Sequence, residues 1–201
     1  MPLVTGFRAT LSGRLRQLAA RPLARLGLAL HRLGVSANAV TCAGFALTLL
    51  AALFIAQGRL QEGGLLLLFS LPLDALDGAV ARAAQGDSRF GGVLDSTLDR
   101  YADAAMFAAL VYHFANPGQM DHLAPALLAM VGSYGVSYVR ARAGEAGIAL
   151  REGLFTRMER VLVLLLALLI PALLLPGLWL LALGSNLTAL QRLWLVYRRE
   201  P

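Results

Sequence analysis

Four aspartates interrupt apolar sequence in one spaced pattern, Asp74-x2-Asp77-Gly78-x2-Ala81-Arg82-x8-Gly91-x3-Asp95-x3-Asp99. An ionised aspartate near the centre of a bilayer costs from about 3 to about 10 kcal/mol, depending on the scale. Four such side chains therefore cannot persist on surfaces that face lipid. They must face one another, water or a cation.

The surrounding composition is that of an integral membrane protein. Hydrophobic residues make up 58% of the 201 residues, and the mean hydropathy is +0.65. A helix that crosses a bilayer needs roughly 20 apolar residues, and six such stretches can be drawn, at 38–57, 63–84, 92–113, 123–142, 157–175 and 178–197. We predict an all-α integral membrane protein with one domain over residues 1–201, in which residues 37–201 form a six-helix transmembrane bundle.

The first 36 residues alternate arginines with leucines. This alternation predicts an amphipathic helix that lies in the membrane interface over residues 1–36. Pro22 is a candidate position for an interruption of that helix. The segment has no compact apolar core followed by a small-residue cleavage site, so we interpret it as part of the mature chain.

Arginines account for all 18 basic residues, and their placement predicts the orientation. If the N-terminus is cytoplasmic, the connections near 85–90 and 143–156 and the C-terminal tail are cytoplasmic too, which leaves only Arg59 outside. The positive-inside rule thus predicts a multi-pass protein of the cell membrane with both termini in the cytoplasm. The net charge of +6 favours anionic lipid or an anionic substrate. Arginines spread along the membrane boundary argue against nucleic acid as a partner.

This topology places the aspartates at one level. Asp74 and Asp77 lie in the cytoplasmic half of the second predicted span, and Asp95 and Asp99 begin the third. Residues three or four apart share one face of a helix, so each pair of carboxylates is aligned. We therefore predict that the two pairs face each other in an active site at the cytoplasmic side.

Four carboxylates in one layer are hard oxygen ligands that suit Mg²⁺ or Mn²⁺. A two-metal site would stabilise both the attacking and the leaving oxygen of a phosphoryl displacement. From the residues alone, two other interpretations stay open. One is a buried ion-pair network with Arg82, Arg89 and Arg100, and the other is a proton or cation pathway.

The aspartate pattern resembles, at every defining position, the signature of the CDP-alcohol phosphotransferase family. The resemblance implies an N-terminal interfacial helix, six transmembrane helices and, usually, a homodimer. It also implies a two-metal centre held by Asp74, Asp77, Asp95 and Asp99. Asp99 is then the general base, which takes the proton from an acceptor hydroxyl that attacks the β-phosphorus of a CDP-linked donor and expels CMP.

The same resemblance implies a set of donor-binding residues, namely Asn38, Thr41, Asp77, Gly78, Ala81 and Arg82. Gly78 and Ala81 match small positions that let the nucleotide approach the helix, and Arg82 matches an arginine that contacts the diphosphate. Asn38 and Thr41 resemble a Pro-Asn-x-x-Thr element of the family, with Ala37 where proline is usual.

The acceptor is predicted from five arginines near the cytoplasmic ends of the last three spans: Arg140, Arg142, Arg157, Arg160 and Arg192. Their surroundings look like the acceptor region of actinobacterial phosphatidylinositol-phosphate synthases, which use a phosphorylated inositol. A phosphomonoester dianion needs charge-assisted partners, whereas positive-inside anchoring explains any single arginine equally well. We predict transfer of a phosphatidyl group from CDP-diacylglycerol to inositol 1-phosphate. Glycerol 3-phosphate, serine and a CDP-inositol donor remain alternatives.

A cation or proton transporter is the alternative from a different class. It predicts carboxylates distributed across the depth of the membrane and, often, repeated halves. The carboxylates here belong to one leaflet and the sequence contains no evident internal repeat. The sequence therefore favours the transferase.

Overall fold

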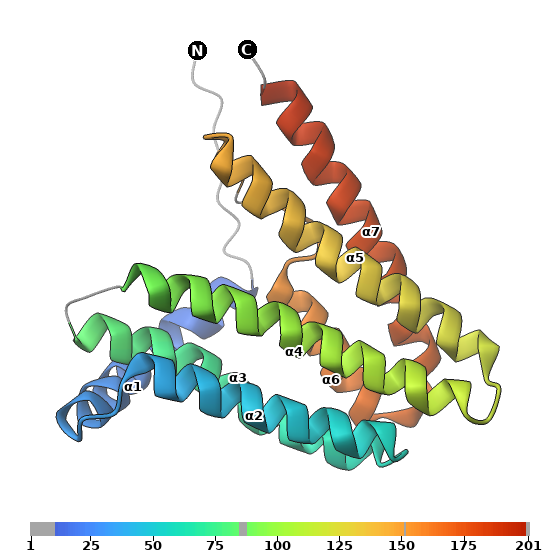
Figure 1. The fold of residues 1–201 in the computed structure, drawn as a ribbon, viewed down its shortest axis with the longest axis horizontal. Coiled ribbons are helices and arrows are strands. Elements are labelled where there is room, and N and C mark those ends of the chain that lie inside the picture. The colour runs from blue at the N-terminus through green and yellow to red at the C-terminus, as the bar shows by residue number, and fades with distance from the viewer. Residues whose placement is uncertain (1–10, 85–87, 151, 200–201) are drawn as a thin grey trace.

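The computed structural model describes residues 11–84, 88–150 and 152–199, with side chains from Pro22 onward (Figure 1). In this part of the chain the regular structure is entirely helical. The elements in order are α1 (Leu11–Arg32), α2 (Ala37–Ala56), α3 (Leu60–Ala83), α4 (Arg89–Ala115), α5 (Met120–Glu145), α6 (Arg157–Leu169), a 3-10 turn η1 (Pro171–Leu173) and α7 (Leu174–Arg199).

The helices α2 to α5 cover the first four predicted spans, but the boundaries of the last two predictions are wrong. The fifth span was expected over 157–175, whereas α6 ends at Leu169 and its 13 residues are about 20 Å long. Pro171 has no N–H to donate and its ring excludes a helical neighbour before it, so Ile170 is extended with φ −116° and ψ 99°. The last helix consequently begins at Leu174 and not at Leu178.

The first helix, α1, is continuous through Pro22, so the interruption considered at that residue does not occur. Further along, α1 packs against α3 at Gly27. A Cβ atom at position 27 would lie 2.7 Å from the main-chain carbonyl carbon of Ala79, which is too close for two carbon atoms. Only glycine, which has no Cβ, therefore fits at this position. Leu23 and Leu30 extend this contact into a small apolar cluster with α3. The helix is thereby fixed beside the part of α3 that carries the aspartates.

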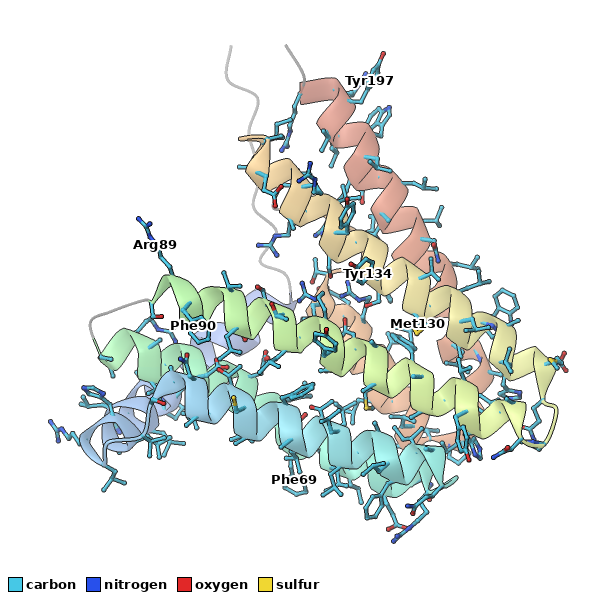
Figure 2. All side chains as sticks on the ribbon, in the orientation of Figure 1. Phe69, Arg89, Phe90, Met130, Tyr134 and Tyr197 are labelled. Carbon is cyan, nitrogen blue, oxygen red and sulfur yellow. The ribbon has the colours of Figure 1, made fainter. Side chains whose placement is uncertain are left out.

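Three segments are long and apolar enough to cross a bilayer within the described residues: Ala37–Ala56, Leu60–Ala83 and Pro171–Arg199. The outer surface is also apolar. Figure 2 shows Phe69, Tyr134 and Tyr197 projecting from the bundle, and each is more than half exposed. Such a surface suits lipid better than water. The chain is an all-helical membrane protein.

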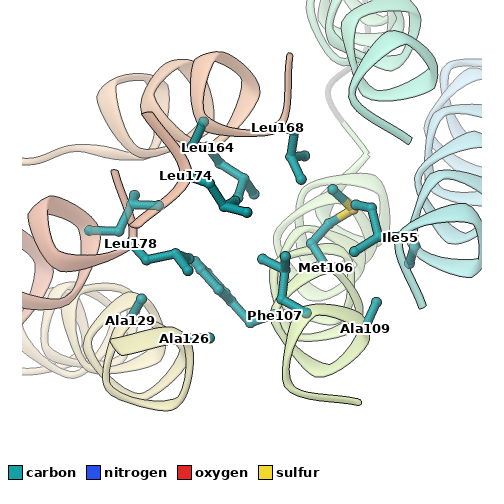
Figure 3. Close-up of a cluster of buried hydrophobic side chains, with 14 of the residues drawn as sticks. Ile55, Met106, Phe107, Ala109, Ala126, Ala129, Leu164, Leu168, Leu174 and Leu178 are labelled. Atoms are coloured by element: carbon teal, nitrogen blue, oxygen red, sulfur yellow. The ribbon is translucent and has the colours of Figure 1, made fainter. Parts of the chain in front are cut away.

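The helices form two groups, which meet through the packing of α4 on α5 and through α6. Helices α2, α3 and α4 run alongside one another, while α5 and α7 lie side by side and lean away from α4 towards their C-terminal ends (Figure 1). Helix α6 packs against both α3 and α7. The main apolar core lies where the C-terminal halves of α2, α4 and α6 meet the start of α7, and Figure 3 shows Ile55, Met106, Leu168 and Leu178 in it. The opposite half of the bundle is left for polar side chains.

Candidate active site

Three carboxylates meet where α3 and α4 face each other. One oxygen atom from each of Asp74, Asp95 and Asp99 lies within 4.8 Å of the other two. Asp95 and Asp99 are one turn apart on α4, so they present their carboxylates on the same face of that helix. Three negative groups at this separation repel one another strongly unless cations neutralise them.

The fourth aspartate, Asp77, is set apart from this group and is oriented by α2. Its side chain is buried, and its Oδ2 accepts a hydrogen bond of 2.8 Å from the hydroxyl of Thr41. Its Oδ1 accepts from the main-chain N–H of Gly78. Asp77 nevertheless lines the same cavity as Asp74 and Asp99. The hydroxyl of Thr41 therefore fixes the direction in which the buried carboxylate points.

Arg157, the first residue of α6, spans two of the three clustered carboxylates. Its Nη1 lies 2.9 Å from both oxygens of Asp74, and its Nη2 lies 2.7 Å from Oδ1 of Asp99. The start of α6 is fixed by a capping box, in which Glu159 accepts from the N–H and the hydroxyl of Thr156. This cap sets the position from which Arg157 reaches the aspartates.

A second arginine of α6 is bound more deeply. The Arg160 side chain is only 4% exposed, and its Nη2 lies 3.3 Å from Oδ2 of Asp103. The hydroxyl of Ser133 donates to the same oxygen at 2.8 Å. Asp103 thus joins α4, α5 and α6. Asp103 continues the face of Asp95 and Asp99 by one more turn, and the sequence left open whether it supports the site or pairs helices. For Ser133 the sequence favoured packing between helices over contact with the acceptor.

These side chains line a cavity of about 290 Å³. The charged part of its wall comprises Asp74, Asp77, Asp99, Asp103, Arg140, Arg157 and Arg160. The apolar part includes Phe45, Leu67, Met106, Phe107 and Leu164. A cavity with one charged and one apolar wall suits a ligand with the same division, such as a lipid with an anionic head.

The charged wall also has unused hydrogen-bond donors. Within the described residues, the buried Nε atoms of Arg157 and Arg160, which belong to this wall, have no hydrogen-bond partner. A buried guanidinium N–H without an acceptor is costly. An anion in the cavity would remove that cost.

The remaining donor-site candidates lie around the ends of α2 and α3. In the part of the chain that the structure describes, Asn38, Gly78, Ala81 and Arg82 are not among the residues that line the cavity. Nη1 of Arg82 lies 3.2 Å from where a Cβ on Gly78 would stand. A larger residue at position 78 would therefore displace the guanidinium of Arg82.

The structure brings together three of the five candidate acceptor arginines. Arg140, Arg157 and Arg160 line the cavity. Arg142 is exposed and forms an ion pair with Glu145 of its own helix. Arg192 is buried, and its guanidinium donates to main-chain carbonyl oxygens.

The sequence profile of one protein family, described as CDP-alcohol phosphatidyltransferase, matches residues 34–193. The chain belongs to the CDP-alcohol phosphatidyltransferase family. This finding confirms the resemblance inferred from the aspartate pattern. The protein is accordingly an enzyme that transfers a phosphatidyl group to an alcohol.

The chain is similar to relatives that are named as inositol phosphate synthases. The chain is 38% identical over 188 residues to the archaetidylinositol phosphate synthase of Pyrococcus horikoshii, covering 92% of this chain and 96% of the relative. It is 38% identical over 184 residues to the phosphatidylinositol phosphate synthase of Mycobacteroides abscessus, covering 88% and 83%. An uncharacterised protein of Aquifex aeolicus is 41% identical over 160 residues, covering 80% and 81%.

Solved structures of the phosphatidylinositol phosphate synthase of Mycobacterium tuberculosis share the fold. The form with CDP-diacylglycerol bound superposes with a TM-score of 0.83 at 33% identity, over 88% of this chain and 94% of that chain. The form in complex with manganese and citrate gives 0.78 at 34% identity, over 88% of each chain. Family membership and the cluster of Asp74, Asp95 and Asp99 together indicate that this enzyme uses a divalent metal ion.

Proposed function

We propose that the enzyme transfers the phosphatidyl group of CDP-diacylglycerol to a hydroxyl of inositol 1-phosphate and releases CMP. The observation that carries this proposal is the presence of three arginines together with Asp74 and Asp99, two members of the carboxylate cluster, on the wall of one cavity. Carboxylates supply a metal centre for the diphosphate of the donor. Arginines supply the charge that a phosphorylated acceptor requires.

The four aspartates Asp74, Asp77, Asp95 and Asp99 are the proposed ligands of two Mg²⁺ or Mn²⁺ ions. All four offer hard oxygen atoms, which these ions prefer, and the mutual approach of three of them within 4.8 Å suits shared cations. The ions would neutralise the diphosphate and the phosphate that leaves with CMP. Arg157 offers one positive charge to the same carboxylates, so it competes with metal for Asp74 and Asp99.

Asp99 is the proposed general base. Its carboxylate lines the cavity and is held from two sides by Arg157 and Arg100, at 2.7 and 3.1 Å. In the reaction Asp99 takes the proton of the acceptor hydroxyl, and the oxygen forms a bond to the β-phosphorus of the donor. The bond between that phosphorus and the oxygen shared with the cytidine phosphate breaks, and CMP leaves with that oxygen. Positioning of these groups supplies most of the acceleration.

The donor is proposed to lie against α2 and α3. Thr41 and Asp77 line the cavity, and the four other candidates, Asn38, Gly78, Ala81 and Arg82, are proposed to contact the cytidine diphosphate. The apolar wall offers a surface for the hydrocarbon part of the lipid. The Mycobacterium tuberculosis enzyme, which has the same fold, has been solved with CDP-diacylglycerol bound, and this likeness supports the same donor here.

The acceptor is proposed to bind at Arg140, Arg157 and Arg160. Guanidinium groups bind phosphate dianions through paired, charge-assisted hydrogen bonds, and Nε of both Arg157 and Arg160 lacks a hydrogen-bond partner within the described residues. Free inositol and serine would offer these arginines no phosphate group, whereas glycerol 3-phosphate would. The names of the Pyrococcus horikoshii and Mycobacteroides abscessus relatives favour inositol phosphate over glycerol phosphate.

The finer membrane arrangement is part of the same proposal. We infer six spans, an interfacial α1, both termini in the cytoplasm and a homodimer. The cavity arginines and Arg82 belong to helix ends at one side of the bundle, and Arg59 precedes α3 at the other, which agrees with the positive-inside rule. Labelling of single cysteines at 59 and 142 from outside intact cells tests the orientation, and the mass of the protein in nanodiscs tests the dimer.

The test of the proposed chemistry is metal-dependent release of CMP. Purified protein in lipid nanodiscs, given CDP-diacylglycerol and inositol 1-phosphate, should release CMP with Mg²⁺ or Mn²⁺. EDTA should stop the reaction, and excess metal should restore it. Release that continues undiminished in EDTA would rule out the two-metal mechanism.

A further inference from the structure

Asp103 lies on α4 one turn beyond Asp99, on the helix face that carries the aspartate cluster. Within the described residues, however, the three carboxylates that could share a metal ion do not include that of Asp103. The carboxylate of Asp103 instead contacts Arg160 and Ser133, and all three residues line the cavity. Asp103 therefore belongs to the arginine side of the site.

The carboxylates near α6 are divided between two arginines of that helix. Arg157 pairs with Asp74 and Asp99 at 2.9 and 2.7 Å. Arg160, one turn further along α6, pairs with Asp103 at 3.3 Å, and within the described residues this is its only ion pair. A buried guanidinium that loses its carboxylate is left with an uncompensated charge. Asp103 therefore stabilises the charge of Arg160 in its buried position.

The carboxylate of Asp103 is itself fixed from α5. Ser133 is only 2% exposed, and its hydroxyl donates to Oδ2 of Asp103 at 2.8 Å. The same Oδ2 accepts a hydrogen bond from Nη2 of Arg160. One carboxylate oxygen thus joins α5 to α6, and Asp103 cannot turn without weakening both bonds.

The guanidinium of Arg160 has one donor left. Nη2 donates to Asp103, Nη1 donates to the carbonyl oxygen of Phe155 at 3.4 Å, and Nε has no partner within the described residues. A guanidinium is a planar, rigid fork, so a bond at Nη2 also sets the direction of the other N–H groups. A misplacement of about 1 Å can cost about a hundredfold in rate. The contact with Asp103 therefore decides where Arg160 can offer Nε to an anion.

We propose that Asp103 is a positioning residue, which orients the buried guanidinium of Arg160 towards the phosphate group of the acceptor, while Ser133 fixes the carboxylate. This assignment rests on the proposed acceptor role of Arg160. Two other roles predict different results. Asp103 could be a further metal ligand, or it could be a competitor that occupies Arg160 until a phosphate displaces it.

Binding of inorganic phosphate tests the proposal without any turnover. The full-length protein in phosphatidylcholine nanodiscs, with EDTA present, is titrated with phosphate in a calorimeter. Asp103→Asn keeps the volume of the side chain and should weaken phosphate binding by about tenfold, because the guanidinium loses the charged group that orients it. Asp103→Glu should restore part of the loss. Unchanged or tighter binding in Asp103→Asn would identify a competitor and overturn the proposal.

Asp121→Asn is the matched control for this titration. Asp121 is exposed in the first turn of α5 and is not among the cavity residues in the described part of the chain. The control should bind phosphate as the unmodified protein does. An equal loss in Asp121→Asn would mean that a general change of charge explains the effect, and it would overturn the proposal.

A titration with Mn²⁺ separates Asp103 from the metal centre. Asp103→Asn should bind Mn²⁺ within twofold of the unmodified protein, because Asp103 is not part of the cluster that could share a metal ion. A larger loss of affinity would assign Asp103 to the metal ligands and overturn the proposal.

A double-mutant cycle tests the contact between Asp103 and Arg160. Asp103→Asn should raise the acceptor KM about tenfold and leave the donor KM unchanged. In an Arg160→Lys background the same change should add less than about twofold, because residues that act through one contact are not additive. A larger rise there would mean that Asp103 meets the acceptor itself and would overturn the proposal.

Two features keep the test decisive. If Asp103→Asn does not fold, Ser133→Ala removes only the hydroxyl that fixes the carboxylate and should weaken phosphate binding by about two- to fivefold. A Ser133→Ala protein that binds phosphate as tightly as the unmodified protein would overturn the proposal. If inositol 1-phosphate releases no CMP, the proposed function fails, whereas the phosphate titration still decides whether Asp103 orients Arg160.

Discussion

Replacement of Thr41 by valine removes one hydroxyl and leaves a side chain of nearly the same volume. That hydroxyl donates to Oδ2 of the buried Asp77 at 2.8 Å. A hydrogen bond to a charged group contributes about 1.5 to 3 kcal/mol. Since 1.4 kcal/mol corresponds to a factor of ten in an equilibrium constant, loss of this bond should weaken metal binding at Asp77 by about 10- to 100-fold. Side chains that orient metal ligands commonly have effects of this size.

The assay is a titration of the protein in nanodiscs with Mn²⁺, in which the paramagnetic resonance signal reports the free ion. Thr41→Ser keeps the hydroxyl and should bind Mn²⁺ almost as tightly as the unmodified protein. Thr48→Val is the matched control on the same helix, because the hydroxyl of Thr48 donates only to the carbonyl oxygen of Gly44, at 3.0 Å. Affinity within twofold of the unmodified protein in Thr41→Val, or an equal loss in Thr48→Val, would refute the reasoning.

Three further changes test other parts of the account. Asp99→Asn should lower CMP release by about a thousandfold and largely retain binding of CDP-diacylglycerol, as measured by native mass spectrometry. Asp103→Ala leaves the buried Arg160 without its carboxylate and should destabilise the protein by about 3 kcal/mol, seen as a lower thermal midpoint in nanodiscs. Gly132→Ala places a Cβ 2.6 Å from Nδ2 of Asn186 and 2.9 Å from its main-chain nitrogen, where α5 meets α7. It should cost about 1 to 3 kcal/mol in the same assay.

Two of these changes have matched controls in the chain. Glu145→Ala removes the carboxylate of the exposed pair with Arg142 and should leave the thermal midpoint unchanged. Gly144→Ala, on the same helix as Gly132, meets no atom within 4 Å and should be neutral or slightly stabilising. If the Asp99→Asn protein retained turnover, Asp99 would not be the general base. If a variant and its control lowered the thermal midpoint equally, the contact named for that variant would not explain its effect.

Much of the fold could be predicted because it follows from local patterns. The predicted spans of about 20 apolar residues agree with the observed bounds of helices α2 to α5 nearly to their ends. The spacing of Asp95 and Asp99 placed both on one helix face. The fifth span was drawn too long because its hydropathy continues through Pro171, while the helix cannot. Hydropathy measures the preference for lipid and carries no information on main-chain hydrogen bonding.

The contacts between distant side chains could not be predicted. Asp74 and Arg157 are 83 positions apart, and no periodicity links them. A single arginine in a sequence can pair with a carboxylate, as Arg157 does, with a neighbour on its own helix, as Arg142 does, or with main-chain carbonyls, as Arg192 does. Only the three-dimensional packing of α5, α6 and α7 selects among these partners.

The most direct test of the central claim is a comparison of acceptors. Purified protein with CDP-diacylglycerol and Mg²⁺ is given inositol 1-phosphate, glycerol 3-phosphate, free inositol or serine, and CMP is measured together with the lipid product. We predict that inositol 1-phosphate alone gives rapid release and a lipid of the matching mass. Equal or faster release with glycerol 3-phosphate, free inositol or serine would contradict the proposed acceptor. No release with any of the four would contradict the proposed reaction.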